Sequence, residues 1–362
     1  MDTSGHNTYY VGHKALKQPG SRRPYQSGAV DRWEDMEAIW EHCFTDCLRV
    51  DTAATKIFLT EPHMPPRANR ETTIETMFEL FNADAAYLHV QPVLALFSAG
   101  LTSGCVVDSG ELATTIYPVS DGYHLTSASK KLTIGGAGIS NILANQIVAN
   151  GKNYDSAMYQ KLRYAGNDIL RSMKESLCYV QPKSPGSGFP KQRSYDDLPN
   201  VTLTGGGSSS AKTTLKFQLP DGNAVECQES DLHACTERLF DPVKFGTICE
   251  PEEDGLHTAI YKSVMKAGVD VRRSLVGAVV LTGGNTMFPG LPERLTTELK
   301  AVMSSSMSGS LKVIAPADRN NAVWSGGSIL TSLSTFDEQW ITSRDYDEMG
   351  PEIVHEKCSI YL

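Results

Sequence analysis

The chain has 362 residues and a formal net charge of -9. With 40% hydrophobic and 21% charged residues, it has the composition of a soluble globular protein that is long enough for two domains. The negative charge argues against free binding to nucleic acid, and no apolar run is long enough to span a bilayer. Eight scattered cysteines indicate reduced thiols in the cytosol or nucleus, because no spacing suggests a disulfide framework.

The first hundred residues predict an arm followed by alternating helices and strands. Residues 1–30 are polar and contain several glycines and prolines, which is typical of irregular structure. Asp31 is the expected N-cap of a helix, with Glu34 three residues later. A stripe at helical spacing in that helix should face a core, namely Trp33, Met36, Trp40, Phe44 and Cys47. Next we expect a strand at 57–60, a helix at 70–81, a strand at 87–90 and a helix at 92–99 that ends at Gly100.

A buried strand at 105–107 then runs into Asp108, Ser109 and Gly110, and a second strand follows. Free backbone N–H groups in such a turn can hold phosphate oxygens, while the carboxylate holds a hydrated divalent cation. Asp-Ser-Gly is also an ordinary hairpin turn, so these residues alone leave both interpretations open.

The middle of the chain changes in composition. Glycines at 135, 136 and 138 precede a predicted helix at 139–148, and a second helix is expected at 158–177. Residues 181–214 contain four prolines and the run GGGSSS, which predicts a flexible insertion with little core. A hairpin is expected from 215–219 and 225–227 around Pro-Asp-Gly.

The last third contains a second glycine turn at a strand end. A helix is predicted at 256–273, and a buried strand at 277–281 leads into Gly283-Gly284 and then a helix at 289–303. This arrangement suits a phosphate or nucleoside, since ligands bind outside strand carboxyl ends in α/β sheets. A strand at 311–315 and a helix at 323–334 complete the pattern, which indicates α/β layers with a cleft between two lobes.

Long ordered stretches resemble actin and the actin-related proteins. They include VVDSG at 106–110, LTGGNTMFPG at 281–290, VWSGGSILTSLSTFDEQWIT at 323–342 and YDEMGPEIVHEKC at 346–358. The resemblance runs from about residue 9 to residue 358. It implies the α/β fold shared by actin, hexokinase and the heat-shock ATPases, with two lobes around a nucleotide cleft.

The resemblance also implies a division of the chain. Residues 1–30 would be an arm, 31–100 the remainder of the first lobe, and 101–315 the second lobe with the insertion 181–214. Residues 316–362 would return to the first lobe.

The implied cofactor is ATP or ADP with Mg²⁺. Gln91 matches the glutamine that places the attacking water, and Asp108 would hold the metal through water. The residues that match nucleotide contacts of the family are Asp108, Ser109, Gly110, Gly136, Arg171, Lys174, Glu175, Gly283, Gly284, Thr286 and Met287.

The chain departs from the family at several of these places. Residues 1–30 contain no Asp-Asn-Gly-Ser-Gly-type hairpin followed by lysine, so the first phosphate hairpin and the N-terminal strands of the first lobe are expected to be missing. Leu112 replaces a glycine whose backbone approaches phosphate, and Thr115 replaces a water-orienting histidine. Asn320 and Asn321 replace a lysine and an aromatic residue beside the base. These changes predict impaired nucleotide binding and hydrolysis.

Three functions are consistent with this pattern. The first is a divergent actin-like structural subunit of a cytoskeletal assembly, such as an axonemal or dynein-associated complex, with weak or no ATPase activity. The second is an ATP-binding, polymerising actin whose N-terminus is missing from the gene model, and the third is a nuclear subunit of a chromatin remodeller. The first predicts a cytoplasmic, cytoskeletal protein with protein partners, one of which covers the truncated first lobe, and with no membrane or direct nucleic-acid contact.

Overall fold

We analysed a computed structural model of the chain, which describes residues 24–26, 29–62, 65–150, 167–183, 201–204, 214–218, 224–242 and 254–358. The chain divides into two compact units. Unit 1 is formed by residues 1–100 and 323–362, and unit 2 by residues 101–322.

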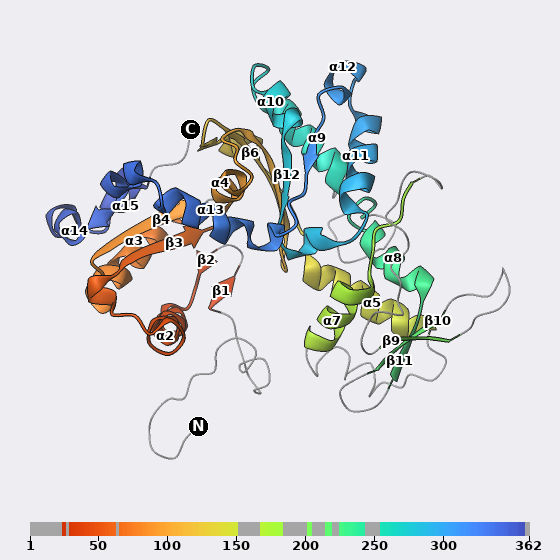
Figure 1. The fold of residues 1–362 in the computed structure, drawn as a ribbon, viewed down its shortest axis with the longest axis horizontal. Coiled ribbons are helices and arrows are strands. Elements are labelled where there is room, and N and C mark those ends of the chain that lie inside the picture. The colour runs from red at the N-terminus through yellow and green to blue at the C-terminus, as the bar shows by residue number, and fades with distance from the viewer. Residues whose placement is uncertain are drawn as a thin grey trace, which may run out of the picture. The chain divides into compact units, whose positions relative to one another are not determined.

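Unit 2 is built on a mixed sheet of six strands (Figure 1). β5 (Gly104–Ser109) lies at its centre, parallel to β12 (Val279–Thr282) and antiparallel to β6 (Thr114–Ser120). β12 pairs in parallel with β13 (Val313–Ile314), and β6 pairs with both β7 (Tyr123–His124) and β8 (Lys130–Leu132). β5 and β12 are almost wholly buried, as expected for strands covered on both faces.

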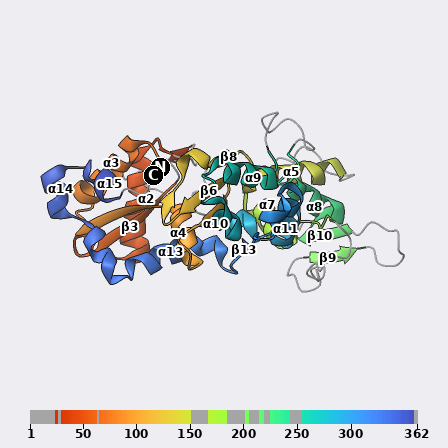
Figure 2. The same ribbon diagram turned by 90° about the horizontal axis from the view of Figure 1, so that it is seen from above.

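Helices with apolar faces cover this sheet. α9 (Leu256–Lys266) and α11 (Leu291–Val302) lie side by side in Figure 1 and Figure 2, and α10 (Arg272–Gly277) packs against β5 and β6. α5 (Gly136–Asn150) contacts α7 (Asn167–Leu177) and α8 (Glu229–Glu237). Their inward side chains form one continuous core with the sheet. The short elements of the unit are η4 (Thr126–Ala128), η7 (Gly284–Met287), α12 (Ser305–Ser308) and η8 (Arg319–Asn321).

A second, three-stranded antiparallel sheet in unit 2 has the order β11–β10–β9. The predicted hairpin is confirmed as β10 (Thr214–Gln218) paired with β11 (Ala224–Gln228). The insertion 181–214 was predicted to be flexible throughout. This prediction is wrong for one part of it, because β9 (Val201–Thr204) pairs with β10. Residues 184–200 and 205–213 lie outside the described part of the chain.

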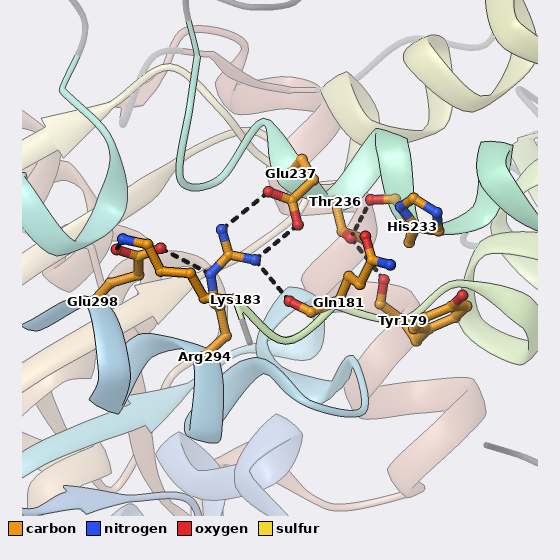
Figure 3. Close-up of polar contacts among 8 residues, drawn as sticks. All are labelled: Tyr179, Gln181, Lys183, His233, Thr236, Glu237, Arg294 and Glu298. Carbon is orange, nitrogen blue, oxygen red and sulfur yellow. Dashed lines mark hydrogen bonds and ion pairs between the residues drawn. The ribbon is translucent and has the colours of Figure 1, made fainter. Parts of the chain in front are cut away.

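The segment that leads into this insertion is held by polar contacts (Figure 3). The Tyr179 carbonyl accepts a hydrogen bond from the Thr236 hydroxyl at 2.7 Å, and the Gln181 carbonyl accepts one from Arg294 Nη1 at 2.6 Å. Lys183 Nζ lies 2.7 Å from Glu298 Oε2. Residues 179–183 are therefore fixed against α8 and α11.

Unit 1 contains a three-stranded sheet with the order β14–β4–β3. β3 (Lys56–Glu61) is parallel to β4 (Ala85–Val90), and β14 (Ile341–Thr342) is antiparallel to β4. All six residues of β4 are buried, which suits its place at the centre. β1 (Tyr25–Gln26) and β2 (Ala29–Val30) form a separate small hairpin.

The helices of unit 1 bury aromatic and aliphatic side chains against this sheet. α4 (Gln91–Ser98) and α13 (Ala322–Thr331) pack closely, because a Cβ added at Gly326 would collide with the Leu94 carbonyl. The remaining helices are α2 (Trp33–His42), η1 (Cys43–Leu48), η2 (Thr52–Ala54), α3 (Arg67–Glu75), η3 (Thr76–Leu80), η9 (Ser334–Gln339), α14 (Ser343–Met349) and α15 (Ile353–Lys357).

Most predicted elements are confirmed, and two local predictions for the first helix are wrong. Arg32, not Asp31, occupies the N-cap of α2, and it makes no side-chain cap, because a guanidinium cannot accept a hydrogen bond from the helix N–H groups. Arg32 Nε donates to Asp35 at 2.8 Å. The stripe of this helix is only partly in the core, since Phe44 is buried but Cys47 is exposed.

The predicted helix at 256–273 is two helices. α9 ends at Lys266, and the backbone becomes extended at Ala267 before α10 begins at Arg272. Arg272 Nη2 and Nε donate to the Met265 and Ala267 carbonyls at 2.7 and 3.0 Å. This side chain therefore supplies donors to backbone carbonyls at the C-terminal end of α9 that have no partner within the helix. None of the described helices combines the length and hydropathy needed to cross a bilayer.

Candidate nucleotide site

The candidate site of unit 2 centres on Asp108 at the end of β5. By strand register, Asp108 lies between Thr282 of β12 and Thr115 of β6. Its carboxylate has no hydrogen bond or ion pair among the described residues, and burial raises its pKa to about 6. An ionised carboxylate without a protein cation is suited to hold a hydrated divalent ion, which supplies the missing positive charge.

The hydroxyl of Ser109 is fully engaged within the protein. Thr114 Oγ1 donates to the Ile134 carbonyl at 2.7 Å, so the 2.6 Å contact between the two hydroxyls has Ser109 as donor. Asn285 Nδ2 in turn donates to Ser109 Oγ at 2.9 Å. A chain of hydrogen bonds therefore links the loop after β12 to the β5–β6 hairpin, and the Ser109 proton is not available to a phosphate.

The turn between β5 and β6 is joined to the start of α5. Gly110 N–H donates to the Ala113 carbonyl at 3.0 Å and closes the turn. At the helix, Gly136 N–H donates to the Gly110 carbonyl at 2.9 Å, and Ala137 N–H donates to the Glu111 carbonyl at 2.8 Å. Two N–H groups of this helix N-terminus thus contact the hairpin, where the sequence predicted that they would face a ligand.

Lys174 of α7 is also held inside the protein. Its buried ammonium donates to the Gly136 carbonyl at 2.9 Å and lies 3.8 Å from Glu111 Oε2. Burial lowers the pKa of Lys174, and the nearby carboxylate of Glu111 opposes that shift. A Cβ added at Gly136 would lie 2.8 Å from both side-chain tips, so this glycine makes room for the pair.

Arg171 and Glu175 lie one helical turn apart on the exposed side of α7. Arg171 Nε is 2.8 Å from Glu175 Oε1, and both side chains are 58% exposed. The structure thus places Lys174 beside Gly136 and Glu111, while it leaves Arg171 and Glu175 at the surface.

The loop after β12 packs directly on the Asp108 hairpin. Gly283 has a φ of +89°, and a Cβ there would collide with the Ser109 carbonyl and lie 2.8 Å from Asp108 Oδ1. Thr286 is buried and donates to the Gly283 carbonyl at 2.7 Å, whereas Met287 is 39% exposed. The two glycine turns predicted from the sequence therefore meet in unit 2.

Several backbone donors at this junction remain available. The N–H groups of Glu111 and Leu112 donate to no acceptor in the part of the chain that the structure describes, and both residues are exposed. Gly284 N–H is likewise without an acceptor there, and a Cβ at Gly284 would meet nothing within 4 Å. Together with Asp108, these groups could hold a phosphate and its cation.

Gln91 belongs to unit 1, at the first position of α4. Its Nε2 lies 3.4 Å from Thr60 Oγ1. Its predicted role with an attacking water stays a prediction.

Two residues of this site were not predicted from the sequence. Asn285 is buried and joins the two loops through Ser109, and Arg319 is buried and donates to Thr286 Oγ1 and the Thr286 carbonyl at 3.1 and 2.8 Å. The only sequence signal was position, since Asn285 lies inside the glycine turn. Asn320 and Asn321, which the sequence predicted to lie beside the base, follow Arg319 directly but are exposed.

The described residues contain no group of three or more His, Cys, Asp or Glu side chains that could hold a metal. A cation at Asp108 would therefore depend on water and on the ligand for its other contacts, as Mg²⁺ does at nucleotide phosphates.

The family model for actin matches residues 1–359. The chain belongs to the actin family. The resemblance and the α/β fold class predicted from the sequence are confirmed, and the fold is the actin fold. ATP or ADP with Mg²⁺ is the usual ligand of actins and is compatible with Asp108 and the two loops. The predicted loss of the first phosphate hairpin concerns residues that lie mostly outside the described part of the chain, and it stays a prediction.

Proposed function

We propose that this actin-family protein is a structural subunit of a cytoskeletal multiprotein assembly, and that it binds nucleotide weakly and hydrolyses it little. The observation that supports this is the internal use of polar groups at the Asp108 hairpin. The Ser109 hydroxyl, the first N–H groups of α5 and the Lys174 ammonium all bond to the protein itself. Because these groups are engaged within the protein, they cannot bond to phosphate, and each such bond that is missing reduces the binding free energy of the nucleotide by about 1.5–3 kcal/mol.

Weak hydrolysis is supported by the row of side chains beside Asp108. Thr115 and Thr282 flank it in register, and the Thr282 hydroxyl donates to the Arg319 carbonyl at 3.0 Å. A threonine hydroxyl is too weakly basic to take a proton from water, as an imidazole could. The described residues of this row thus include no general base other than Asp108.

Residual nucleotide binding is supported by what the site retains. Asp108 keeps an unpaired carboxylate, and the N–H groups of Glu111, Leu112 and Gly284 have no acceptor in the described structure. Protonation of Asp108 competes with cation binding, so Mg²⁺-dependent affinity should fall below about pH 6.

The test is ATP binding to the purified full chain with and without Mg²⁺, measured by calorimetry, beside phosphate release. We expect a dissociation constant above about 10 μM, weakened further in Asp108→Ala, and no measurable turnover. Asp270→Ala is the matched control, because Asp270 is exposed in the same unit. Submicromolar binding that depends on Asp108, accompanied by turnover, would overturn the proposal.

The partner in this proposal binds unit 1. Within the described residues β3 pairs only with β4, so its other edge offers unpaired backbone groups. We expect an extended segment of another protein to pair with that edge. If the chain expressed alone is a monodisperse monomer that unfolds cooperatively, this part of the proposal is wrong.

The assembly we favour is cytoskeletal, including the axoneme, over a nuclear one. Membership of the actin family supports this choice. Fluorescence of the tagged full chain in ciliated cells tests it, since an exclusively nuclear signal would favour a chromatin remodeller.

A further inference from the structure

Glu111 brings a carboxylate into the candidate nucleotide site. It follows Gly110 in the turn between β5 and β6, and its side chain lies against Gly136 at the start of α5. Glu111 Oε2 is 3.8 Å from Lys174 Nζ, and a Cβ added at Gly136 would lie 2.8 Å from both atoms. An acidic side chain of the protein is therefore the neighbour of a lysine that was predicted to contact the nucleotide.

The two members of this pair differ in exposure. The Lys174 side chain is 7% exposed and donates to the Gly136 carbonyl at 2.9 Å, whereas the Glu111 side chain is 44% exposed. At 3.8 Å the two charged groups attract each other without a hydrogen bond. Because Glu111 is the more exposed partner, its side chain can leave the pair without disturbing the core.

Glu111 also supplies a backbone donor that a phosphate could use. Its N–H and that of Leu112 have no acceptor among the residues that the structure describes. A phosphate on the Glu111 N–H would lie within one side-chain length of the carboxylate of the same residue. Two anions at such a separation repel each other, so removal of the Glu111 charge should favour a phosphate there.

We propose that Glu111 is an internal competitor of phosphate-bearing ligands, because its carboxylate holds the Lys174 ammonium and repels an anion at the hairpin. Neutralising Glu111 releases Lys174 from this pair and removes one negative charge from the site. This inference rests on the proposed function, because it names one cause of weak nucleotide binding. It also makes Glu111 a determinant of specificity, since ligands with more negative charge are repelled more strongly.

The test is binding of magnesium pyrophosphate and of magnesium ATP to the full chain, measured by calorimetry for the wild type and for Glu111→Gln. Pyrophosphate has no base or ribose, so it reports on the phosphate contacts alone. We expect both ligands to bind about five- to thirtyfold more tightly to the variant. Glu111→Ala should show the same gain. Binding that is unchanged or weaker in both variants would overturn the inference.

Glu226 provides the matched control. Its carboxylate also pairs with a lysine, Lys216, at 2.8 Å and is 53% exposed, but it belongs to β11. Glu226→Gln should bind both ligands as the wild type does. A gain equal to that of Glu111→Gln would mean that only the net charge of the chain matters, and it would contradict the inference. Melting temperatures within about 3 °C of the wild type verify that these variants fold.

A further measurement separates an electrostatic effect from a rearrangement of the hairpin. The ratio of the affinities of Glu111→Gln and wild type should decrease between about 0.05 and 0.5 M salt, because salt screens exposed charges. The gain should also be smaller in a Lys174→Met background, where no ammonium is released. A gain that is equal in both backgrounds, or that does not depend on salt, would contradict the inference.

Failure of this inference and failure of the proposed function are distinguished in the same titrations. Submicromolar ATP binding to the wild type, accompanied by turnover, would overturn the structural-subunit proposal. Weak wild-type binding that neither Glu111 variant improves would overturn only the role of Glu111.

Discussion

At the scale of single residues, two adjacent glycines in the loop after β12 make different demands on the backbone. Gly283 has a positive φ and lies against the Ser109 carbonyl and Asp108 Oδ1, whereas a Cβ at Gly284 would meet nothing. We expect Gly283→Ala to lower the free energy of unfolding by about 2–4 kcal/mol and Gly284→Ala by less than about 1 kcal/mol. Urea denaturation of the two variants tests this, and equal losses would contradict it.

Asp108 predicts a pH-dependent stability effect. Its folded pKa of about 6 lies above the ordinary value, so its ionisation destabilises the fold. Any stability that Asp108 contributes is present below about pH 4 and lost as the pH rises through 6. We therefore expect Asp108→Asn to stabilise the ligand-free protein by about 1–2 kcal/mol at pH 7.5.

The same variant should have no advantage at pH 4, because Asp108 is then protonated. Urea titrations at the two pH values measure this difference. A destabilised Asp108→Asn at pH 7.5 would mean that the carboxylate has a stabilising partner.

At the scale of secondary-structure elements, Arg294 connects three parts of unit 2. Its guanidinium donates to Glu237 through two bonds of 2.9 and 3.1 Å, to Glu298 at 2.9 Å and to the Gln181 carbonyl at 2.6 Å (Figure 3). It also lies 4.8 Å from the Phe240 ring centroid. Only 10% of the side chain is exposed, and its removal would take both of these bonds from Glu237 and leave Glu298 with Lys183 alone.

We expect Arg294→Ala to lower the free energy of unfolding by about 3–5 kcal/mol. Arg344→Ala is the matched control, because Arg344 pairs with Glu348 but is 87% exposed, and its loss should cost less than about 0.5 kcal/mol. Chemical denaturation compares the two variants. Similar small losses would mean that α8 and α11 do not depend on this ion pair.

The elements show how far local patterns can predict this fold. Strands β4, β5 and β12 follow from short apolar runs, because burial on both faces needs little more than continuous hydrophobicity. The break between α9 and α10 was not predicted, because it depends on hydrogen bonds from the Arg272 side chain to the Met265 and Ala267 carbonyls. β9 was also missed, since its strand structure depends on pairing with β10 across nine intervening residues.

The candidate site was predictable in part for a similar reason. Asp108 and the glycine turns are recognisable from residue types at strand ends. The bond from Asn285 to Ser109 joins residues 176 positions apart, and only the folded sheet brings them together. Which donors are free and which are used internally therefore could not be predicted from the sequence.

At the scale of the whole molecule, charge is unevenly divided between the two units. By sequence, unit 1 contains 20 Asp and Glu but 11 Lys and Arg, which accounts for the formal charge of -9, whereas unit 2 contains 22 of each and is neutral. This excess favours a partner with a basic surface, and association should weaken as ionic strength rises.

The two units should also respond in opposite directions to mild acid. In unit 1, His89 is buried among aromatic rings, and its ring centroid lies 6.2–6.3 Å from those of Phe58, Tyr87 and Phe97. Burial lowers the pKa of His89 to about 4, so the ring is neutral in the fold. The stability from this neutral state is present above pH 6.5 and is lost as the pH falls from 6.5 to 4. Asp108 has the reverse effect in unit 2, because its protonation below pH 6 relieves an unfavourable charge.

We therefore expect unit 1 to lose about 2–3 kcal/mol between pH 6.5 and 4 through His89 alone. His89→Phe should remove this loss, since phenylalanine fits an aromatic surrounding and has no charge to bury. Hydrogen exchange of β4 in unit 1 and of β5 in unit 2, followed over this pH range, separates the two contributions. If β4 exchange accelerates in acid equally in the wild type and in His89→Phe, the surface carboxylates and not the buried imidazole determine the acid sensitivity of unit 1.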